Sequence, residues 1–228
     1  MRHHRRSMPA SRPAPADPTA GAVAEVVAAL RARILDGALA PGDRLVERVL
    51  VDEFDCARHT ARMALRTLQD EGLVSVERNR GAAVAALDVE RLRGLFEVRA
   101  ALELESAHRM LERHDGRVAA PVHAAVARLD AVCAARRPAW RRVVEAHEGV
   151  HEALVHAGES RRIAEAYARL SGEIRLFVIA LRPLWTPATM AQHHRELLDA
   201  LEDDGPAALR RHLREGEGSV RAALTADG

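Results

Sequence analysis

Three histidines lie close together in the stretch AHEGVHEALVH, at positions 147, 151 and 156. If this stretch is helical, His147 and His151 lie one turn apart on the same face, whereas His156 points elsewhere. Two imidazoles directed at one point are typical of a metal site. A pair of polar side chains on a surface helix has the same spacing, so the stretch alone leaves both interpretations open.

The composition sets the frame in which these histidines must be placed. A chain of 228 residues is long enough for two small domains, each with its own core. Aromatic residues make up only 3%, and Ala, Leu and Val dominate the apolar share, which predicts closely packed helices. The net charge of +1 identifies no partner, and because every basic residue is Arg, a single arginine is weak evidence of function unless its spacing supports it.

The cysteines and the N-terminal segment indicate where the protein works. Cys56 and Cys133 lie in separate segments with apolar periodicity, which predicts buried thiols in a reducing compartment rather than a disulfide. Residues 1–20 are basic and then rich in Pro and Ala, without an apolar run that could form a signal peptide or a membrane span. We therefore expect a disordered tail over residues 1–20 and a cytoplasmic protein that does not bind membranes.

Residues 21–87 have the pattern of a winged helix-turn-helix domain. Apolar residues at helical spacing follow Gly21 and stop at the Gly/Pro-rich stretch DGALAPGDRL. A short helix is expected over about residues 47–54 and a third over about 57–71, before Gly72. Two short alternating runs around NRG then predict a β-hairpin with Arg80 and Gly81 near its tip. Three helices followed by a hairpin match the winged helix-turn-helix plan.

The third of these helices is the candidate recognition helix. One face is apolar and should pack on the core; it consists of Ala57, Ala61, Ala64, Leu65 and Leu68. Beside that face runs a ridge of arginines at every fourth position, Arg58, Arg62 and Arg66. Arg58 and Arg62 can reach guanine edges or phosphates, and Arg80 suits a groove or backbone contact. An ordinary solvated face rich in Arg is the alternative.

A longer stretch resembles a known family. LRARILDGALAPGDRLVERVLVDEFDCARHTARMALRTLQDEGLVSVERNRGAAV is similar, in order, to the DNA-binding domain of the GntR family of bacterial transcription regulators. The resemblance implies that the operator is contacted by Arg48, Arg58, His59, Thr60, Arg62 and Gly81. Two positions depart from the family pattern, because Ala57 replaces a Ser or Thr and Thr60 replaces a Pro. The loss of the hydroxyl at Ala57 removes a group suited to a phosphate contact.

Residues 88–228 read as about six helices separated by Gly or Pro signals, with connections short enough for an antiparallel bundle. The segment LRGLFEVRAALELESAHRML resembles the first helix of the FCD effector domain of the FadR-like GntR branch. Six helices resemble the VanR-type subset of that branch. The expected fold is therefore mainly α, with a winged helix-turn-helix domain over 21–87 and an antiparallel all-helical bundle over 88–228.

The FCD resemblance also bears on the histidines. Its metal-binding version carries D-x-x-x-H, E-H-R and R-x-H-L motifs, whose places are held here by His147 and His151, by His194 and by His212. His147 replaces the family's Asp, and the gap before His212 is a few residues short. The last helix should therefore begin late, at Pro206, and could carry His212 out of reach. His156 and His193, which is turned by about 100° from His194, are expected to be exposed.

The resemblance implies what such a site would bind. An all-imidazole set favours zinc or nickel over manganese or magnesium. FCD regulators commonly sense small organic acids, and Arg99, at a pocket-facing position of the family, could pair with a carboxylate; Arg175 is a second candidate. Ion pairs on a helix surface are the alternative for both arginines. A metal-free FCD pocket for a larger ligand such as acyl-CoA also stays open.

Two functions of different classes follow from these expectations. The first is a DNA-binding transcription regulator and not an enzyme. It is expected to be a repressor that binds a palindromic double-stranded operator as a homodimer, with an effector that changes the spacing of its DNA-binding domains. The second is a metal-dependent hydrolase, in which HEGVH would supply Glu148 as general base. The hydrolase would leave residues 1–87 without a role.

Overall fold

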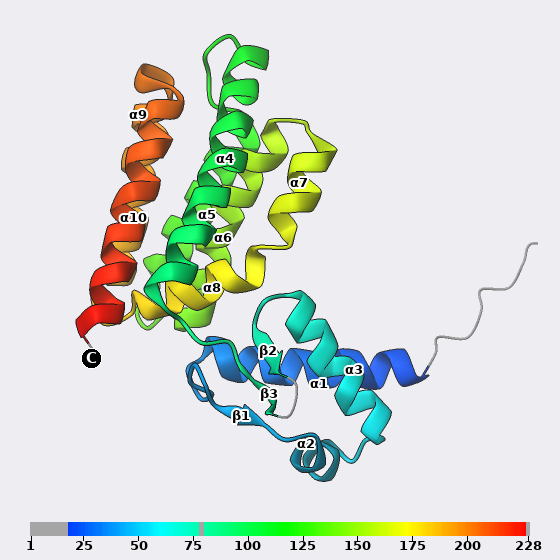
Figure 1. The fold of residues 1–228 in the computed structure, drawn as a ribbon. Helices are drawn as coiled ribbons and strands as arrows, with labels where there is room; N and C mark the ends of the chain where they lie inside the picture. Colours follow the sequence, from blue (N-terminus) through cyan, green and yellow to red (C-terminus); the bar gives the residue numbers. More distant parts are fainter. Residues whose placement is uncertain (1–17, 78–79, 227–228) are drawn as a thin grey trace, which may run out of the picture.

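The computed structural model describes residues 18–77 and 80–226, which form two units connected in the chain between β3 and α4 (Figure 1). The elements in chain order are α1 (Pro18–Leu35), β1 (Arg44–Leu45), α2 (Glu47–Phe54), α3 (Arg58–Asp70), β2 (Val74–Glu77), β3 (Gly81–Val84), α4 (Val89–Arg113), α5 (Ala120–Cys133), α6 (Trp140–Ala157), α7 (Arg161–Ala168), α8 (Ser171–Ala180), α9 (Pro187–Asp204) and α10 (Pro206–Ala226). The mainly helical fold expected from the sequence is confirmed.

The first unit is three helices and a small antiparallel sheet. The strand order is β1-β3-β2, and β2 pairs with β3 from Val74 opposite Val84 to Glu77 opposite Gly81. Helix α2 has the bounds predicted for it, and α3 is followed by Gly72, whose φ of +76° lies in the left-handed region that glycine tolerates. The winged helix-turn-helix plan is therefore present, with a two-residue strand, β1, added at the edge of the wing.

Two details of this unit differ from expectation. Helix α1 begins at Pro18, inside the range assigned to a disordered tail, while residues 1–17 lie outside the described residues. Ala57 is the exposed, extended residue before α3, and Thr60 takes the buried position instead, at 4% exposure. The reason is that Thr60 lies one turn before Ala64 and so shares the face of α3 that Ala61, Ala64 and Leu68 bury.

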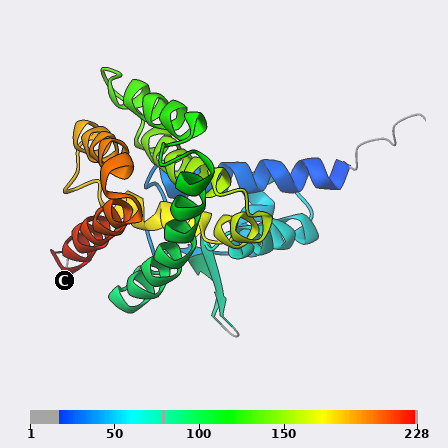
Figure 2. The same ribbon diagram turned by 90° about the horizontal axis from the view of Figure 1, so that it is seen from above.

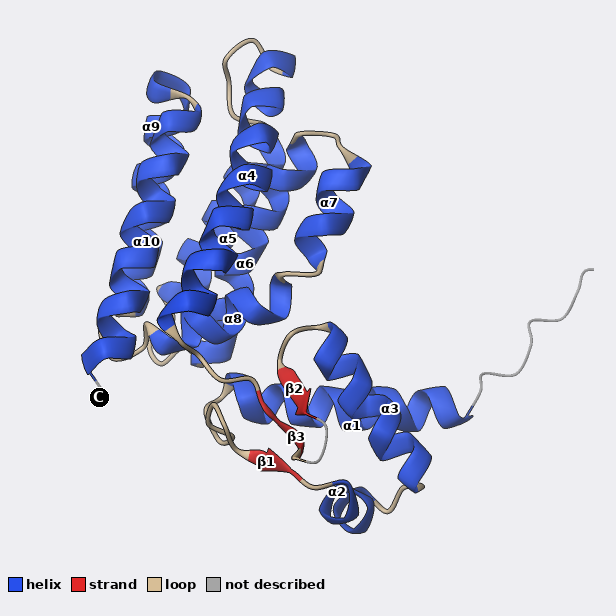
Figure 3. Cartoon of the chain, in the orientation of Figure 1, coloured by secondary structure: helices blue, strands red, loops and turns tan. Residues whose placement is uncertain are grey.

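The second unit contains only helices and loops in the part of the chain that the structure describes (Figure 3). Helix α4 packs against α6 and α10, while α9 packs against α5 and α10. Viewed from above, α1 extends beyond the outline of this helical bundle (Figure 2). Cys56 and Cys133 are free thiols, but both are half-buried rather than buried. None of the helices described here combines the length and the apolar character needed to span a bilayer.

The bundle has seven helices over the described residues, so the expected number of six is wrong. The likeness to the VanR-type subset rested on that number and gains no support from it. The chain between Gly158 and Trp185 forms two helices, α7 and α8, with a break at Arg169 and Leu170. Tyr167 of α7 is buried in the bundle, whereas Leu176 of α8 is buried in the core of the first unit.

Helix α8 lies between the two units and contacts both. Its residue Gly172 approaches Glu71 so closely that an added Cβ would lie 1.6 Å from the Glu71 carbonyl oxygen. Glu173 forms an ion pair with Arg91 at the start of α4. On its other side, Ile174, Phe177 and Val178 are buried in the core of the bundle.

Candidate functional site

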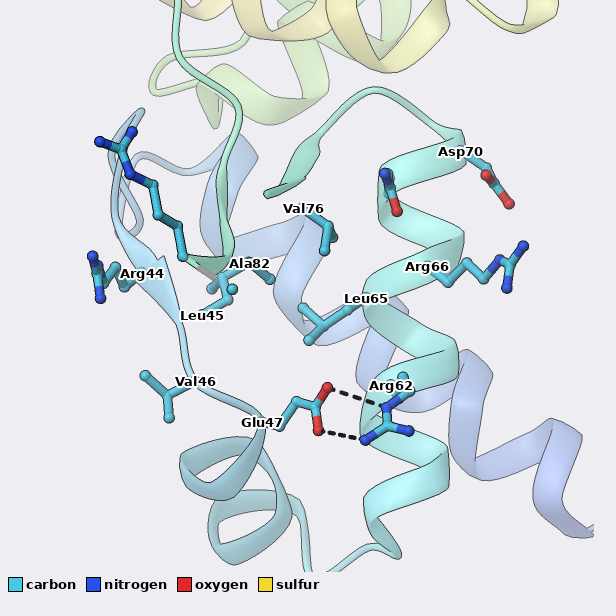
Figure 4. Close-up of a pocket in the computed structure, with 13 residues that line it drawn as sticks. Arg44, Leu45, Val46, Glu47, Arg62, Leu65, Arg66, Asp70, Val76 and Ala82 are labelled. Carbon is cyan, nitrogen blue, oxygen red and sulfur yellow. Dashed lines mark hydrogen bonds and ion pairs between the residues drawn. The ribbon is translucent and has the colours of Figure 1, made fainter. Parts of the chain in front are cut away.

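The first candidate site is a hollow between α3, β1 and the wing, with a volume of about 810 Å³ (Figure 4). Arginines from three elements line it, namely Arg44, Arg62, Arg66 and Arg80. Two carboxylates, Glu47 and Asp70, also belong to its walls. The Arg62 guanidinium donates hydrogen bonds of 3.2 Å to both carboxylate oxygens of Glu47. The hollow thus presents positive charge beside an exposed helix face, as expected of a surface that contacts phosphates.

Most of the arginines predicted to contact DNA are exposed to solvent, although Arg62 pairs with Glu47 and Arg80 with Glu77. Arg48, Arg58 and His59 are exposed, and the side chains of Arg62 and Arg80 are 65% and 76% exposed. Gly81 is exposed at the start of β3 with a φ of +79°. Thr60, also predicted to contact DNA, does not belong to this set. Because it lies on the buried face of α3, its side chain is not presented to a nucleic-acid groove.

Two arginines of the hollow were missing from the predicted site. Arg44 lies on β1, which pairs with β3 through Arg44 opposite Ala83. A strand of two residues leaves no periodic signal in the sequence, so nothing placed Arg44 beside the wing. Arg66 could have been included, because it continues the ridge of Arg58 and Arg62 on the exposed face of α3.

The second candidate site is a cluster of histidines inside the bundle. All four predicted ligands are buried, with His147 and His151 on α6, His194 on α9 and His212 on α10. The Nε2 atoms of His151 and His194 lie 3.3 Å apart. Helix α10 does begin at Pro206, and His212 stays in reach, with its ring centroid 4.7 Å from that of His194. The three helices therefore bring the four imidazoles into one cluster, in which ligand atoms of His147, His151 and His194 lie within 4.8 Å of one another and His212 is grouped with His194 and His193.

The outer nitrogens of the two central rings are held by hydrogen bonds. His151 Nδ1 donates to Glu103 Oε2 at 2.7 Å, and His194 Nδ1 donates to the Met190 carbonyl oxygen at 2.8 Å. In the neutral rings the Nε2 lone pairs must then face each other, which is repulsive without a cation between them. Two nitrogens bound at ~2.0–2.1 Å to one tetrahedral zinc lie about 3.3–3.4 Å apart. The observed separation of 3.3 Å therefore fits a metal-binding geometry.

The electrostatics of the cluster keep its imidazoles neutral. Burial, with the neighbouring histidines, lowers the pKa of His147, His194 and His212 well below the usual 6.5. Burial also lowers the pKa of His151, against the opposing effect of Glu103. For Glu103, burial opposes ionisation, but Arg99 and His151 outweigh it and bring the pKa to about 2. The cluster thus offers neutral nitrogen donors backed by an ionised carboxylate, which is the protonation state that metal binding requires.

His193 was expected to be exposed, and this expectation is wrong. Its side chain is only 14% exposed and stacks on His212, with ring centroids 4.1 Å apart and planes inclined by 21°. Helix α10 covers the position, because Glu215 lies 3.0 Å from His193 Nε2. The rotation of about 100° between His193 and His194 follows from helix geometry. It does not show that a neighbouring helix covers His193. His156 is exposed, as expected.

A cavity of about 20 Å³ adjoins the cluster, lined by residues that include Phe96, Arg99 and Trp185. Arg99 is buried at 3% exposure, donates from Nε to Glu103 at 2.9 Å, and leaves one terminal nitrogen without a partner among the described residues. Arg175 does not line the cavity and instead pairs with Glu148. On α8 it is turned by about 100° from Ile174, which does line the cavity.

Two stretches of the chain match models of known protein families. Residues 22–84 match the model of the bacterial regulatory proteins of the gntR family, and residues 94–215 match the FCD domain. The comparison with curated proteins gives no significant match.

Solved structures of similar architecture cover nearly the whole chain. A transcriptional regulator GntR from Rhodococcus sp. RHA1 is 25% identical, with a TM-score of 0.72 over 89% of this chain and 99% of that one. McbR/YncC of E. coli is 20% identical, with a TM-score of 0.64 over 90% and 98% of the two chains. Lar, which controls the Listeria monocytogenes agr system, is 16% identical, with a TM-score of 0.58 over 90% and 96%. Since the FCD model alone matches more than half of the sequence, the chain belongs to the GntR family of transcription regulators and carries an FCD effector domain.

Proposed function

We propose that this GntR-family regulator is a repressor whose FCD domain binds one divalent transition metal ion and a small carboxylate effector. The observation that carries the proposal is the pair of Nε2 atoms 3.3 Å apart on His151 and His194, each fixed by a hydrogen bond on its other nitrogen. Buried nitrogens without partners on His147 and His212 support it further. Such groups are costly to bury unless a ligand satisfies them.

Zinc or nickel suits this set of donors best. His147, His151, His194 and His212 offer only imidazole nitrogen, which these cations accept more readily than manganese or magnesium do. A bound divalent ion would supply positive charge and coordination positions open to a carboxylate oxygen. The Glu103 carboxylate, hydrogen-bonded to His151, would orient that ring and strengthen its donor nitrogen.

Arg99 is the residue proposed to hold the carboxylate of the effector. Its guanidinium lies in the wall of the small cavity, and its unpartnered terminal nitrogen is a donor for an anion. Phe96 stacks beneath it, with the guanidinium carbon 4.9 Å from the ring centroid. Arg175 is not retained in this role, because Glu148 neutralises it away from the cavity.

The cavity size favours a small effector over the acyl-CoA alternative. A space of about 20 Å³ accommodates a single water molecule, so even a small acid requires some widening and an acyl-CoA requires far more. The hydrolase alternative is disfavoured for a different reason. Glu148, its general base, is committed to an ion pair with Arg175 and does not line the cavity beside the histidines.

The proposed repressor acts in the cytoplasm on a palindromic operator, as a homodimer that places one winged helix-turn-helix domain in each half-site. Its proposed DNA surface consists of arginines on β1, α2 and α3 and of two wing residues, Arg80 and Gly81. The arginines on β1, α2 and α3 are Arg44, Arg48, Arg58, Arg62 and Arg66. The exposed side chain of His59 belongs to the same surface.

The decisive experiment combines metal analysis with DNA retardation. We expect purified protein to carry close to one equivalent of zinc or nickel per chain and to retard a palindromic fragment from its own promoter region. A panel of small organic acids should contain one that changes retardation only while the metal is bound. Arg99→Lys should fold and bind DNA but respond only at higher acid concentration, because lysine lacks the bidentate fork. An unchanged response of Arg99→Lys would place the carboxylate elsewhere.

A further inference from the structure

His193 has the features of a metal ligand, although it is not one of the four ligands that the FCD resemblance implies. The Glu215 carboxylate holds its Nε2 at 3.0 Å, which places the free lone pair of the ring on Nδ1. That Nδ1 atom is buried and has no hydrogen-bond partner among the described residues. A carboxylate on one ring nitrogen and a free second nitrogen are the usual arrangement of a ligating histidine.

The five histidines form two triads that share one member. Potential ligand atoms of His147, His151 and His194 all lie within 4.8 Å of one another, and the same holds for His193, His194 and His212. We name the first set the inner triad and the second the outer triad. The side chain of His151 is only 1% exposed, whereas that of His193 is 14% exposed, so the outer triad lies nearer to solvent.

Each triad has one histidine whose outer nitrogen is hydrogen-bonded to a carboxylate. Glu103 backs His151 in the inner triad at 2.7 Å, and Glu215 backs His193 in the outer triad at 3.0 Å. The outer triad is further ordered by ring packing, since His193 stacks on His212 and meets Trp185 edge-on with centroids 4.9 Å apart. Hydrogen bonds and ring packing therefore fix the orientation of histidine rings in both triads.

We propose that the outer triad is a second position for a divalent transition metal, occupied in alternation with the inner one. This inference rests on the proposed metal-dependent function and adds a second position to it. The two positions exclude each other because His194 has only one nitrogen to offer, its Nδ1 being bound to the Met190 carbonyl. Imidazole nitrogens suit the same class of cation in both, namely zinc, cobalt or nickel.

Removal of one triad should expose the other. His147→Ala breaks the inner triad and His193→Phe the outer one, while the phenyl ring keeps the stacking on His212 and Trp185. Wild type and both single variants should each bind one equivalent of Zn²⁺ or Co²⁺ in equilibrium dialysis. The double variant should bind at least about 100-fold more weakly, because neither triad is complete. The rings that remain, His151, His194 and His212, do not form a third group within 4.8 Å of one another among the described residues.

Glu215 offers a finer test in the His147→Ala background, where only the outer triad is complete. Glu215→Gln should weaken Co²⁺ binding about 10-fold, the usual effect of losing a carboxylate behind a ligating histidine. His156→Phe in the same background is the matched control for the His147→Ala/His193→Phe double variant. It should leave Co²⁺ affinity unchanged, since His156 is exposed on α6. The visible d–d absorption of bound Co²⁺ should also differ between His193→Phe and His147→Ala.

Three results would overturn the second position. They are equal affinity of His147→Ala and the double variant, no cation bound by a folded His147→Ala protein, and loss of binding in His193→Phe alone. Circular dichroism and thermal unfolding establish folding, and His147→Asn replaces His147→Ala if the latter does not fold. Failure of wild type to bind any cation would instead refute the proposed metal-dependent function as well, so the two failures are distinct.

Discussion

At the scale of single residues, the most informative feature is His147, where an imidazole replaces the aspartate of the pattern that the bundle resembles. Its ring centroid lies 4.9 Å from that of His151 and 4.7 Å from that of His194. Burial keeps the His147 pKa well below its usual value, so the ring is neutral and its nitrogens are free to bind a cation. The choice of metal should therefore depend on this residue.

Restoring an oxygen ligand at this position should change the metal. His147→Asp is expected to keep a bound cation but to shift selectivity from zinc towards manganese, because a hard anionic oxygen suits manganese better. Metal analysis after loading with an equimolar zinc and manganese mixture measures the shift. His156→Asp serves as control for the added charge. An unchanged zinc-to-manganese ratio would mean that residue 147 does not contact the metal.

Arg58 and Arg62 should carry much of the DNA recognition. Each change to Ala is expected to cost on the order of 1–3 kcal/mol of binding free energy if the side chain reads a base edge. Arg62 must leave Glu47 to do so, and the 65% exposure of its side chain permits the movement. Fluorescence anisotropy with an operator duplex measures the loss. Arg161→Ala, at a side chain 90% exposed on α7, is the control. A double Arg58/Arg62 variant with full affinity contradicts the assignment.

At the scale of elements, α8 packs against both the effector domain and the DNA-binding domain. One face of α8 lines the small cavity through Ile174, Phe177 and Val178, and Leu176 is buried in the core of the first unit. A ligand that widens the cavity must displace α8 or its neighbours, since the present space of about 20 Å³ is smaller than any organic acid. A displacement of α8 would therefore also move Leu176 in the core of the first unit.

Gly172→Ala tests the contact between the two units. The added methyl group would lie 1.6 Å from the Glu71 carbonyl oxygen, a backbone atom that cannot move alone, so α8 must shift away from the first unit. We expect a loss of about 1–3 kcal/mol in the free energy of unfolding, as for other overpacked sites. Gly149→Ala, in mid-α6 with nothing within 4 Å of its Cβ, should instead stabilise by roughly 0.5–1 kcal/mol. Urea denaturation compares the two, and equal stability of both variants would refute the contact.

At the scale of the whole molecule, the buried histidines make the stability of the metal-free protein depend on pH. In the folded chain the pKa values of His147, His194 and His212 are lowered well below 6.5, whereas in the unfolded chain they return to about 6.5. Below that pH these histidines bind protons in the unfolded state but remain neutral in the folded state. The neutral histidines therefore favour the folded state above pH 6.5, and this advantage is lost as the pH falls.

Urea unfolding of chelator-treated protein should show this directly. The free energy of unfolding is expected to be constant from about pH 8 to pH 7.5 and to decrease progressively from about pH 6.5 to pH 5.5. His147→Asn should reduce the slope, because an amide does not titrate in this range, while His156→Asn should leave it unchanged. An equal free energy of unfolding at pH 8 and pH 5.5 is the opposite of what the burial of these rings requires.

The sequence by itself determined the features that depend on local periodicity and on the order of motifs. The bounds of α2, the arginine ridge on α3, the start of α10 at Pro206 and the one-turn spacing of His147 and His151 all follow from contacts within a few residues. The same local signals were sufficient to predict the winged helix-turn-helix domain and a helical bundle, and the resemblance to the FCD family implied that the bundle is an effector domain. They were insufficient for β1, whose two residues pair only through β3.

Only the tertiary structure decided which side chains meet across elements. Thr60 is buried because the face of α3 that it shares with Ala64 packs in the core of the first unit, and Arg175 points away from the cavity, paired with Glu148 of α6. His193 joins the cluster because α10 covers it with Glu215 and His212. Leu176 of α8 is likewise buried in the core of the first unit rather than in that of the bundle. These outcomes depend on burial and charge supplied by residues distant in the chain, which periodicity within one segment does not encode.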